Sequence, residues 1–168
     1  MKQSPARPAV RPGANLPPAQ LQAVQRAIDA RRTLPGALLP ILHAVQDALG
    51  HVPPDAIPLI AHELNLTRAD VHGVVSFYHH FRSTPPGRHI VQICRAEACQ
   101  SLGADALGAH VRNRLEVDWH GTTHDGAVTL EPVFCLGLCA VGPSALLDGR
   151  PLGRLDPARI DAELGDAA

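Results

Sequence analysis

The sequence predicts a mixed α/β protein in which a small all-helical unit precedes a compact α/β layer. Apolar residues recur at helical spacing in the first half of the chain, whereas short β-branched segments alternate with helical patterns in the second half. The turn-rich segment STPPGRH, residues 83–89, separates the two patterns. With 45% hydrophobic residues among 168, the chain is apolar enough to bury a core.

The chain begins with a basic, proline-rich segment at residues 1–16, for which we expect a flexible or partner-wrapping tail. This segment lacks the apolar run of a secretory signal, and we expect no membrane span anywhere in the chain. A net charge of −1 provides no basic excess that would favour nucleic acid. The sequence therefore predicts a cytoplasmic protein, in a compartment where thiols stay reduced.

Residues 17–82 are expected to form the helical unit. Apolar periodicity indicates helices around residues 21–28, 38–49 and 54–63, and Gly50 is a candidate C-terminal cap for the second of these. Thr67 and Asp70 fit a capping box that opens a fourth helix, with Val71, Val74, Val75 and Tyr78 on one face. We interpret the neighbouring aromatic group as helix packing: Phe77, Tyr78 and Phe81.

Residues 88–165 are expected to form the α/β layer. Strands are predicted at residues 89–93, 127–134 and 144–147, and helices at 102–115 and 157–164. The tetrapeptide DGRP, at residues 148–151, is predicted to be a hairpin turn. The predicted order is therefore strand, helix, strand, strand, helix.

The chain contains four cysteines in two close pairs, Cys94 with Cys99 and Cys135 with Cys139. Both pairs are expected in loops just beyond strand ends. Reducing conditions disfavour disulfides, and neither pair has the two-residue spacer of a catalytic dithiol. Zinc and a [2Fe–2S] cluster can each be held by four thiolates, and the spacing alone leaves both open.

Longer motifs around these cysteines resemble a known family. The segments LLPILHAVQDALGHVP (38–53), VHGVVSFYHHFRSTPPGRH (71–89) and FCLGLCAVGPSALLDG (134–149) are similar to the small flavoprotein-fragment subunit of respiratory complex I and its relatives. These proteins are thioredoxin-like [2Fe–2S] ferredoxins, and the resemblance covers residues 20–165. Within this group, ICRAEACQ (93–100) and SFYHHFR (76–82) look most similar to the gamma subunit of molybdenum-containing, NAD-dependent formate dehydrogenase.

The resemblance implies a thioredoxin-like domain after a helical domain, with one [2Fe–2S] cluster held by Cys94, Cys99, Cys135 and Cys139. It implies a larger iron–sulfur partner subunit that carries FMN and NAD, and a molybdenum-containing subunit that oxidises formate. This chain would then transfer electrons and would catalyse no reaction alone. A complex I or NAD-linked hydrogenase subunit is the alternative within the family, and a zinc-stabilised interaction module is the alternative outside it.

No substrate site is apparent in the chain itself. No glycine-rich fingerprint follows a predicted strand, so NAD is expected on another polypeptide. The adjacent His79 and His80 favour a surface or interface role, since neighbouring helical residues point to different sides. Arg95 and Glu97 lie between the first two cysteines, where they either tune the site or contact a partner, or are simply solvated loop charges.

Overall fold

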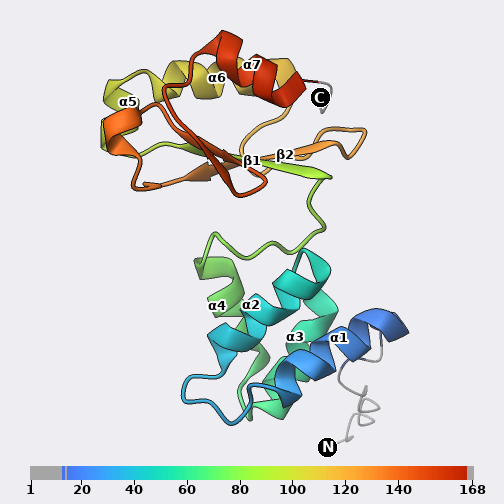
Figure 1. The fold of residues 1–168 in the computed structure, drawn as a ribbon. Helices are drawn as coiled ribbons and strands as arrows, with labels where there is room; N and C mark the ends of the chain where they lie inside the picture. The colour runs from blue at the N-terminus through green and yellow to red at the C-terminus, as the bar shows by residue number, and fades with distance from the viewer. Residues whose placement is uncertain (1–12, 14, 166–168) are drawn as a thin grey trace, which may run out of the picture. The chain divides into compact units, whose positions relative to one another are not determined.

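The structure is a computed structural model that describes residue 13 and residues 15–165 (Figure 1). Most of the predicted tail, residues 1–12 and 14, therefore lies outside the described residues. The chain divides into two compact units, Met1–Pro85 and Pro86–Ala168. Within the described part, every helix is too short or too polar to span a bilayer. The mixed α/β class that the sequence predicts is confirmed.

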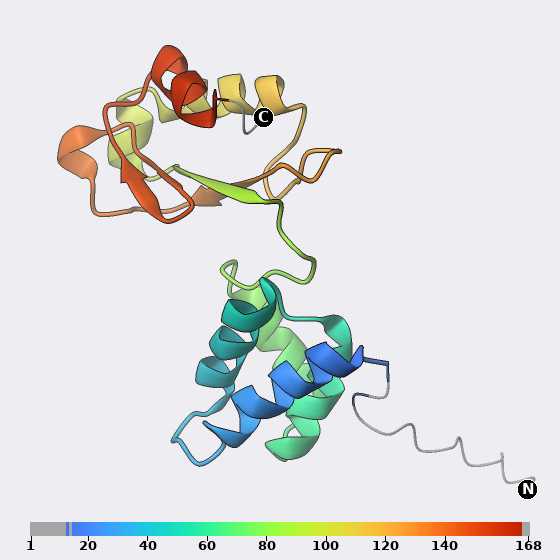
Figure 2. The same cartoon turned by 45° about the vertical axis from the view of Figure 1, so that its right-hand side comes forward.

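The first unit is helical and packs as two helix pairs. It contains α1 (Pro18–Asp29), α2 (Leu38–Leu49), the 3-10 turn η1 (Pro54–Ala56), α3 (Ile57–Glu63) and α4 (Arg68–Phe77). Helix α1 packs on α2, and α3 packs on α4 (Figure 2). Fully buried aliphatic side chains from these helices form the core: Val24, Ile28, Ile41, Leu42, Val45, Ile60 and Val71.

Two predicted helix ends are confirmed in this unit. Helix α2 stops at Gly50, whose φ of 78° is the left-handed conformation that glycine adopts without strain. Helix α4 opens with the predicted capping box, in which the Asp70 N–H donates to Thr67 Oγ1 and the Thr67 N–H donates to Asp70 Oδ2. Both ends depend on short-range hydrogen bonds, which explains why local sequence predicted them.

The aromatic residues at and after the end of α4 differ from the prediction. Phe81 is buried, as expected for helix packing, but Phe77 is 72% and Tyr78 is 44% exposed. Tyr78 lies beyond the last helical residue with an extended ψ of 104°, so its side chain leaves the face that carries Val71. The interpretation as helix packing therefore holds for Phe81 alone of the three.

A buried glutamine fixes the chain as it leaves the helical unit. The Gln46 side chain is 5% exposed. Its Nε2 donates to the His80 carbonyl at 2.7 Å, and its Oε1 accepts the Arg82 N–H at 2.8 Å. The Val52 N–H also donates to the Arg82 carbonyl at 2.7 Å. Residues 80–82 are thus held by hydrogen bonds to α2, through Gln46, and to the segment after it, through Val52.

The second unit is a four-stranded sheet with helices on one face (Figure 1). It contains β1 (His89–Cys94), α5 (Glu97–Ser101), α6 (Ala104–Leu115), β2 (Val128–Val133), the 3-10 turn η2 (Cys139–Val141), β3 (Ala145–Leu147), β4 (Arg150–Leu152) and α7 (Pro157–Leu164). The strand order is β2-β1-β3-β4, with β1 parallel to β2 and antiparallel to β3. Helices α6 and α7 pack together over the sheet. The core between them includes Val91, Ile93, Leu107, Val111, Leu130, Ile160 and Leu164.

Two elements of this unit correct the prediction. The hairpin turn consists of Asp148 and Gly149, both with positive φ, whereas Arg150 and Pro151 belong to β4. Proline is tolerated there because β4 is an edge strand. The short helix α5 was also not predicted, since five residues are too few for a periodic pattern. The remaining predicted strands and helices of this unit are confirmed within a few residues.

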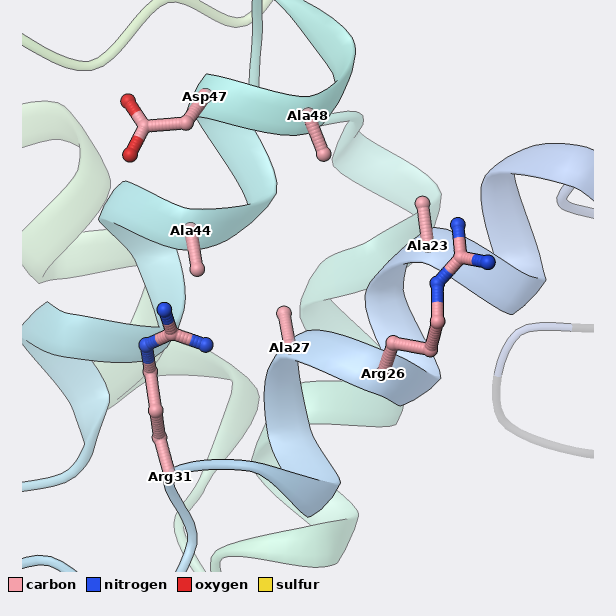
Figure 3. Close-up of a pocket in the computed structure, with 7 residues that line it drawn as sticks. All are labelled: Ala23, Arg26, Ala27, Arg31, Ala44, Asp47 and Ala48. Carbon is pink, nitrogen blue, oxygen red and sulfur yellow. The ribbon is translucent and has the colours of Figure 1, made fainter.

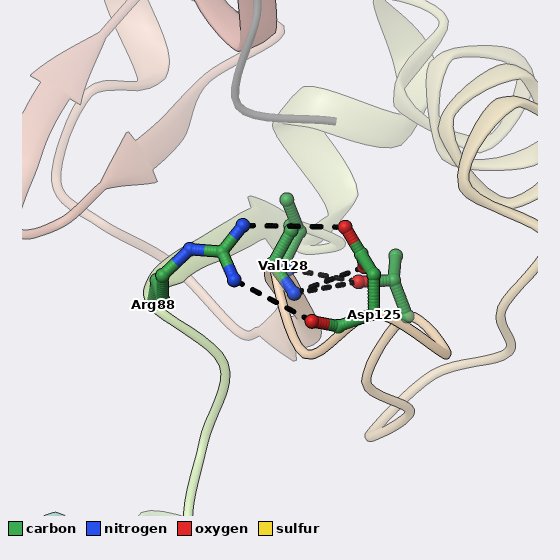
Figure 4. Close-up of polar contacts among 5 residues, drawn as sticks. Arg88, Asp125 and Val128 are labelled. Carbon is green, nitrogen blue, oxygen red and sulfur yellow. Dashed lines mark hydrogen bonds and ion pairs between the residues drawn. The ribbon is translucent and has the colours of Figure 1, made fainter.

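A polar turn closes the sheet end remote from the cysteines (Figure 4). Thr123 Oγ1 accepts the N–H groups of Ala127 and Val128, both at 3.0 Å. The Arg88 guanidinium donates to the Asp125 carbonyl at 3.4 Å. Hydrogen bonds from Thr123 and from the Ala127 N–H lower the pKa of Asp125. These contacts anchor the starts of β1 and β2.

Candidate metal centre

The four cysteines lie at one end of the sheet because two parallel strands end at the same edge. In the β1–β2 register Cys94 lies opposite Val133, so the segments that follow both strands start side by side. Cys94 is the last residue of β1, Cys99 lies on α5 and Cys139 begins η2. The expectation that both pairs lie in loops beyond the strands is therefore correct for Cys135 only. The strand and the short helices hold the other three sulfurs more rigidly than loops would.

The two pairs differ in burial. Cys94 and Cys99 are 2% and 1% exposed, and we call them the inner pair. Cys135 and Cys139 are exposed and form the outer pair, with their Sγ atoms 3.9 Å apart. One side of the site therefore belongs to the protein interior and the other faces outward.

Backbone N–H groups converge on the inner sulfur of Cys94. Burial raises the pKa of this thiol. The Cys99 thiol and three backbone N–H groups hydrogen-bond to it and together leave its pKa below the ordinary value; these N–H groups belong to Ala96, Cys135 and Leu136. Two of the three belong to the loop that carries the outer pair, which places this loop beside Cys94. Such an environment stabilises an anionic thiolate ligand.

The outer-pair loop turns through two residues with positive φ, Cys135 at 78° and Gly137 at 75°. This conformation is uncommon for a residue with a side chain. It lets the Gly137 N–H donate to Cys135 Sγ at 3.4 Å. Successive N–H groups that point to one side are a recurring way to stabilise bound anionic groups.

The other three cysteines all raise the pKa of Cys139. The hydrogen bond with Cys135 and the negative charge of the Cys135 thiolate raise the pKa of Cys139. The charges of Cys99 and Cys94 raise this pKa further. Four thiolates at one place repel, so a cationic metal group would be needed to neutralise them. The side chains as they stand share one end of the sheet without converging on one point: among the described residues, no group of three or more His, Cys, Asp or Glu could hold a metal ion. An all-sulfur donor set with N–H donors around it fits an iron–sulfur group in its chemistry.

Two small residues that sequence reasoning did not assign to the site pack against Cys99. A Cβ atom on Gly142 would lie 3.4 Å from Cys99 Sγ and 2.9 Å from Leu102 Cδ1, so only glycine fits without displacement. Ser144 is 1% exposed, and its Oγ lies 3.4 Å from Cys99 Sγ. The only available sequence signal was the position of both residues just after the second cysteine pair.

Arg95 is held by α6 and the following loop, while Glu97 is exposed. The Arg95 Cζ atom lies 5.1 Å from the centroid of the Trp119 ring, and its Nη2 lies 3.4 Å from Asp105 Oδ1. The Trp119 ring in turn packs against Gly108, where an added Cβ would come within 2.9 Å of it. Arg95 is therefore a packed residue in the structure and is no freely solvated loop charge.

The remaining candidates lie away from the cysteines in the chain. His79 and His80 are exposed, and the ring of His80 lies 5.2 Å from that of His43. A shallow groove between α1 and α2 is lined by alanines and rimmed by Arg26, Arg31 and Asp47 (Figure 3). No cysteine lines this groove, and its alanines let the two helices approach closely.

The family model of the thioredoxin-like [2Fe-2S] ferredoxins matches residues 24–168. The chain belongs to this family. A [2Fe–2S] cluster is the group after which the thioredoxin-like [2Fe-2S] ferredoxins are named, so membership confirms the predicted cofactor. The match includes most of the helical unit and all of the α/β unit that carries the cysteines.

Relatives of this ferredoxin belong to pyridine-nucleotide-linked enzymes. It is 28% identical to the HndA subunit of the NADP-reducing hydrogenase of Solidesulfovibrio fructosivorans, over 90% of this chain and 88% of the relative. It is 32% identical to one subunit of the NADH-quinone oxidoreductase of Escherichia coli, over 84% of this chain and 86% of the relative. A crystal structure of an NAD+-reducing [NiFe]-hydrogenase in the air-oxidized state is similar, with a TM-score of 0.66 and 31% identity. That likeness covers 82% of this chain but only 23% of the hydrogenase chain.

Proposed function

We propose that this chain is an electron-transfer subunit whose single [2Fe–2S] cluster is held by Cys94, Cys99, Cys135 and Cys139. The observation that carries the proposal is the placement of both cysteine pairs at one end of the sheet in a member of a [2Fe-2S] family. When bound, such a cluster exchanges one electron. The inner pair and its N–H donors would hold the buried side, while the exposed outer pair would form the face at which electrons enter and leave.

The electron donor or acceptor would be a larger subunit that carries FMN and NAD. Hydride transfer moves two electrons, and a flavin converts this into one-electron steps that a [2Fe–2S] site can accept. The names of the relatives support such a partner, since they are subunits of NADH- and NADP-linked enzymes. Phe134 precedes the outer pair and is 71% exposed, which suits a residue that a partner covers. We place this assembly in the cytoplasm, where the thiols stay reduced before cluster insertion.

For the parent enzyme we propose an NAD-dependent formate dehydrogenase with a separate molybdenum-containing catalytic subunit. The support is the similarity of ICRAEACQ and SFYHHFR to the gamma subunit of that enzyme. The second candidate is the corresponding small subunit of complex I or of an NAD-linked hydrogenase. The relatives favour this candidate, because their names refer to quinone oxidoreductases and hydrogenases.

The cluster is tested first on the full chain purified without oxygen. We expect a red-brown protein with iron and acid-labile sulfide in equal amounts. Dithionite should bleach it and produce a one-electron rhombic EPR signal. A colourless protein that keeps stoichiometric zinc after iron reconstitution would contradict the proposal and favour the zinc-stabilised interaction module.

The parent enzyme is tested by purifying the tagged chain from its native cells together with its partners. A formate dehydrogenase complex should contain molybdenum and reduce NAD+ with formate. Hydrogen-dependent NAD+ reduction with nickel, or NADH-dependent quinone reduction without molybdenum, would identify the second candidate in its place. The same preparation reveals whether FMN is present on a larger partner.

A further inference from the structure

Ser144 lies beside the buried half of the proposed cluster site. Its Oγ and the Sγ of Cys99 are 3.4 Å apart, within hydrogen-bonding distance for sulfur. Both residues are 1% exposed, so water does not compete for this contact. A hydroxyl in such a place needs a hydrogen-bond partner, because leaving it unsatisfied is costly.

The backbone holds this hydroxyl in position. The Ser144 carbonyl accepts the Cys94 N–H at 2.9 Å, which continues the antiparallel pairing of Ile93 with Ala145. Ser144 therefore binds the backbone of one inner cysteine and touches the sulfur of the other. Gly142 also lies close to Cys99, since a Cβ added there would be 3.4 Å from Cys99 Sγ.

The direction of the hydrogen bond follows from the chemistry of a ligand sulfur. Between a thiol and a hydroxyl, either group can donate. A cysteine that binds iron is a thiolate and has no proton to donate. In the cluster-bound protein, the Ser144 O–H must therefore donate to Cys99 Sγ.

We propose that Ser144 is a positioning residue that raises the reduction potential of the [2Fe–2S] cluster by donating a hydrogen bond to Cys99 Sγ. The inference rests on the proposed ligand set. Reduction adds negative charge that the cysteine sulfurs share, so a donor on one sulfur stabilises the reduced form more than the oxidised form. Loss of the hydroxyl should lower the midpoint potential by ~59 mV. For a one-electron couple, this corresponds to an about tenfold smaller ratio of reduced to oxidised protein at a fixed potential.

The test is a redox titration of full-length variants, followed by visible absorption and EPR. Ser144→Ala should keep its iron and sulfide content and have a midpoint potential lower by about this amount. Ser144→Thr keeps the hydroxyl and should stay close to the wild-type potential, whereas the similarly shaped Ser144→Val should follow Ser144→Ala. The matched control is Ser101→Ala on α5, since the Ser101 hydroxyl donates to the Ala98 carbonyl at 2.9 Å and is exposed.

The outcomes separate this inference from the proposed function. A wild-type protein without a cluster would overturn the proposed function itself. A cluster of unchanged potential in Ser144→Ala and Ser144→Val would overturn only the role of Ser144. If both hydroxyl-free variants lose the cluster while Ser144→Thr retains it, Ser144 serves cluster binding, and the proposed effect on potential is overturned as well.

Discussion

The Sγ atoms of Cys135 and Cys139 lie 3.9 Å apart on the exposed side of the site, while Cys94 and Cys99 are buried. In the protein without a cluster, the inner sulfurs are buried and the outer sulfurs are exposed. In the protein with a cluster, we propose that all four sulfurs bind iron. The inner sulfurs also fill the interior, where they pack with Ala104. This asymmetry leads to the first prediction.

Substitution of an inner cysteine should cost stability even without a cluster. We expect Cys99→Ala to lower the free energy of unfolding of the apo protein by about 1 kcal/mol, because it empties a packed position. Cys139→Ala should change it by less than about 0.5 kcal/mol, because that position is exposed. Both variants should lose or alter the cluster spectrum. Urea unfolding of the apo proteins checks the difference, and equal destabilisation by the two variants would contradict it.

Gly142→Ala should weaken cluster retention through a steric contact alone. The φ of Gly142 is −67°, which alanine adopts freely, so backbone strain plays no part. The new Cβ would press on Leu102 Cδ1 at 2.9 Å and on Cys99 Sγ at 3.4 Å. Leu102 is half exposed and can move, but a sulfur bound to iron cannot.

The measurement for Gly142→Ala is the half-life of the visible absorption band in the presence of a chelator, which should shorten. Gly73→Ala is the matched control, because an added Cβ at this position in α4 meets nothing within 4 Å. The control should leave the half-life unchanged and stabilise its helix slightly. An unchanged half-life in Gly142→Ala would mean that the loop yields without disturbing the sulfur.

Gln46→Leu should destabilise the helical unit by about 2 kcal/mol, since it removes both hydrogen bonds to the chain at His80 and Arg82. Gln46→Glu should cost at least as much, because the carboxylate can still accept the Arg82 N–H but brings a buried negative charge and a second acceptor oxygen against the His80 carbonyl. Thermal unfolding followed by far-ultraviolet circular dichroism is the measurement. Gln22→Leu makes the same change at an exposed position of α1 and should have little effect. Similar melting temperatures for both Leu variants would refute the importance of this contact.

Asp161 should make the α/β unit sensitive to acid. Its Oδ1 lies 2.9 Å from His110 Nε2 and 2.7 Å from Arg114 Nη1. The hydrogen bond with His110 lowers the pKa of Asp161 most, burial opposes it, and Arg114 lowers the pKa further. A carboxylate whose pKa is lowered by folding stabilises the fold above its unfolded pKa of about 3.9, and this contribution disappears as the pH falls through the lowered folded value.

Asp161→Asn should therefore lower the urea midpoint at pH 7 and have little effect in strong acid, below both pKa values. The fluorescence of Trp119, the only tryptophan, reports on the unit that contains Asp161. Asp47→Asn changes an exposed acid of the other unit and serves as the control. A midpoint difference that persists in strong acid would show that the aspartate acts through packing.

Local sequence predicted those elements whose stability depends on neighbours within a few positions. The helix from Leu38 to Leu49 and its glycine cap, and the capping box at Thr67, follow from periodicity and from hydrogen bonds over three or four residues. The strand β4 was missed because Arg150–Leu152 becomes a strand only by pairing with β3. The exposure of Phe77 and Tyr78 was missed because the pattern does not reveal where α4 stops.

The features of the site also fall into those that the local sequence predicts and those that depend on tertiary contacts. The cysteines were recognisable by residue type and spacing, and their assignment as ligands stays a prediction. Ser144 was not recognisable, because its contact with Cys99 joins residues 45 positions apart. The same holds for Arg95, whose packing on Trp119 depends on where the loop after α6 returns to the sheet.

The sequence by itself determined the class of fold, the approximate positions of its helices and the presence of four thiols in two close pairs. Only the tertiary structure decided which sulfurs are buried, which N–H groups donate to Cys94, and that Ser144 and Gly142 lie close to Cys99. The physical reason is the sequence separation over which each interaction acts. Periodicity and capping are short-range effects that depend on residues within one segment. Burial and hydrogen bonding at the site depend on the pairing of β1 with β2 and β3, which no single segment specifies.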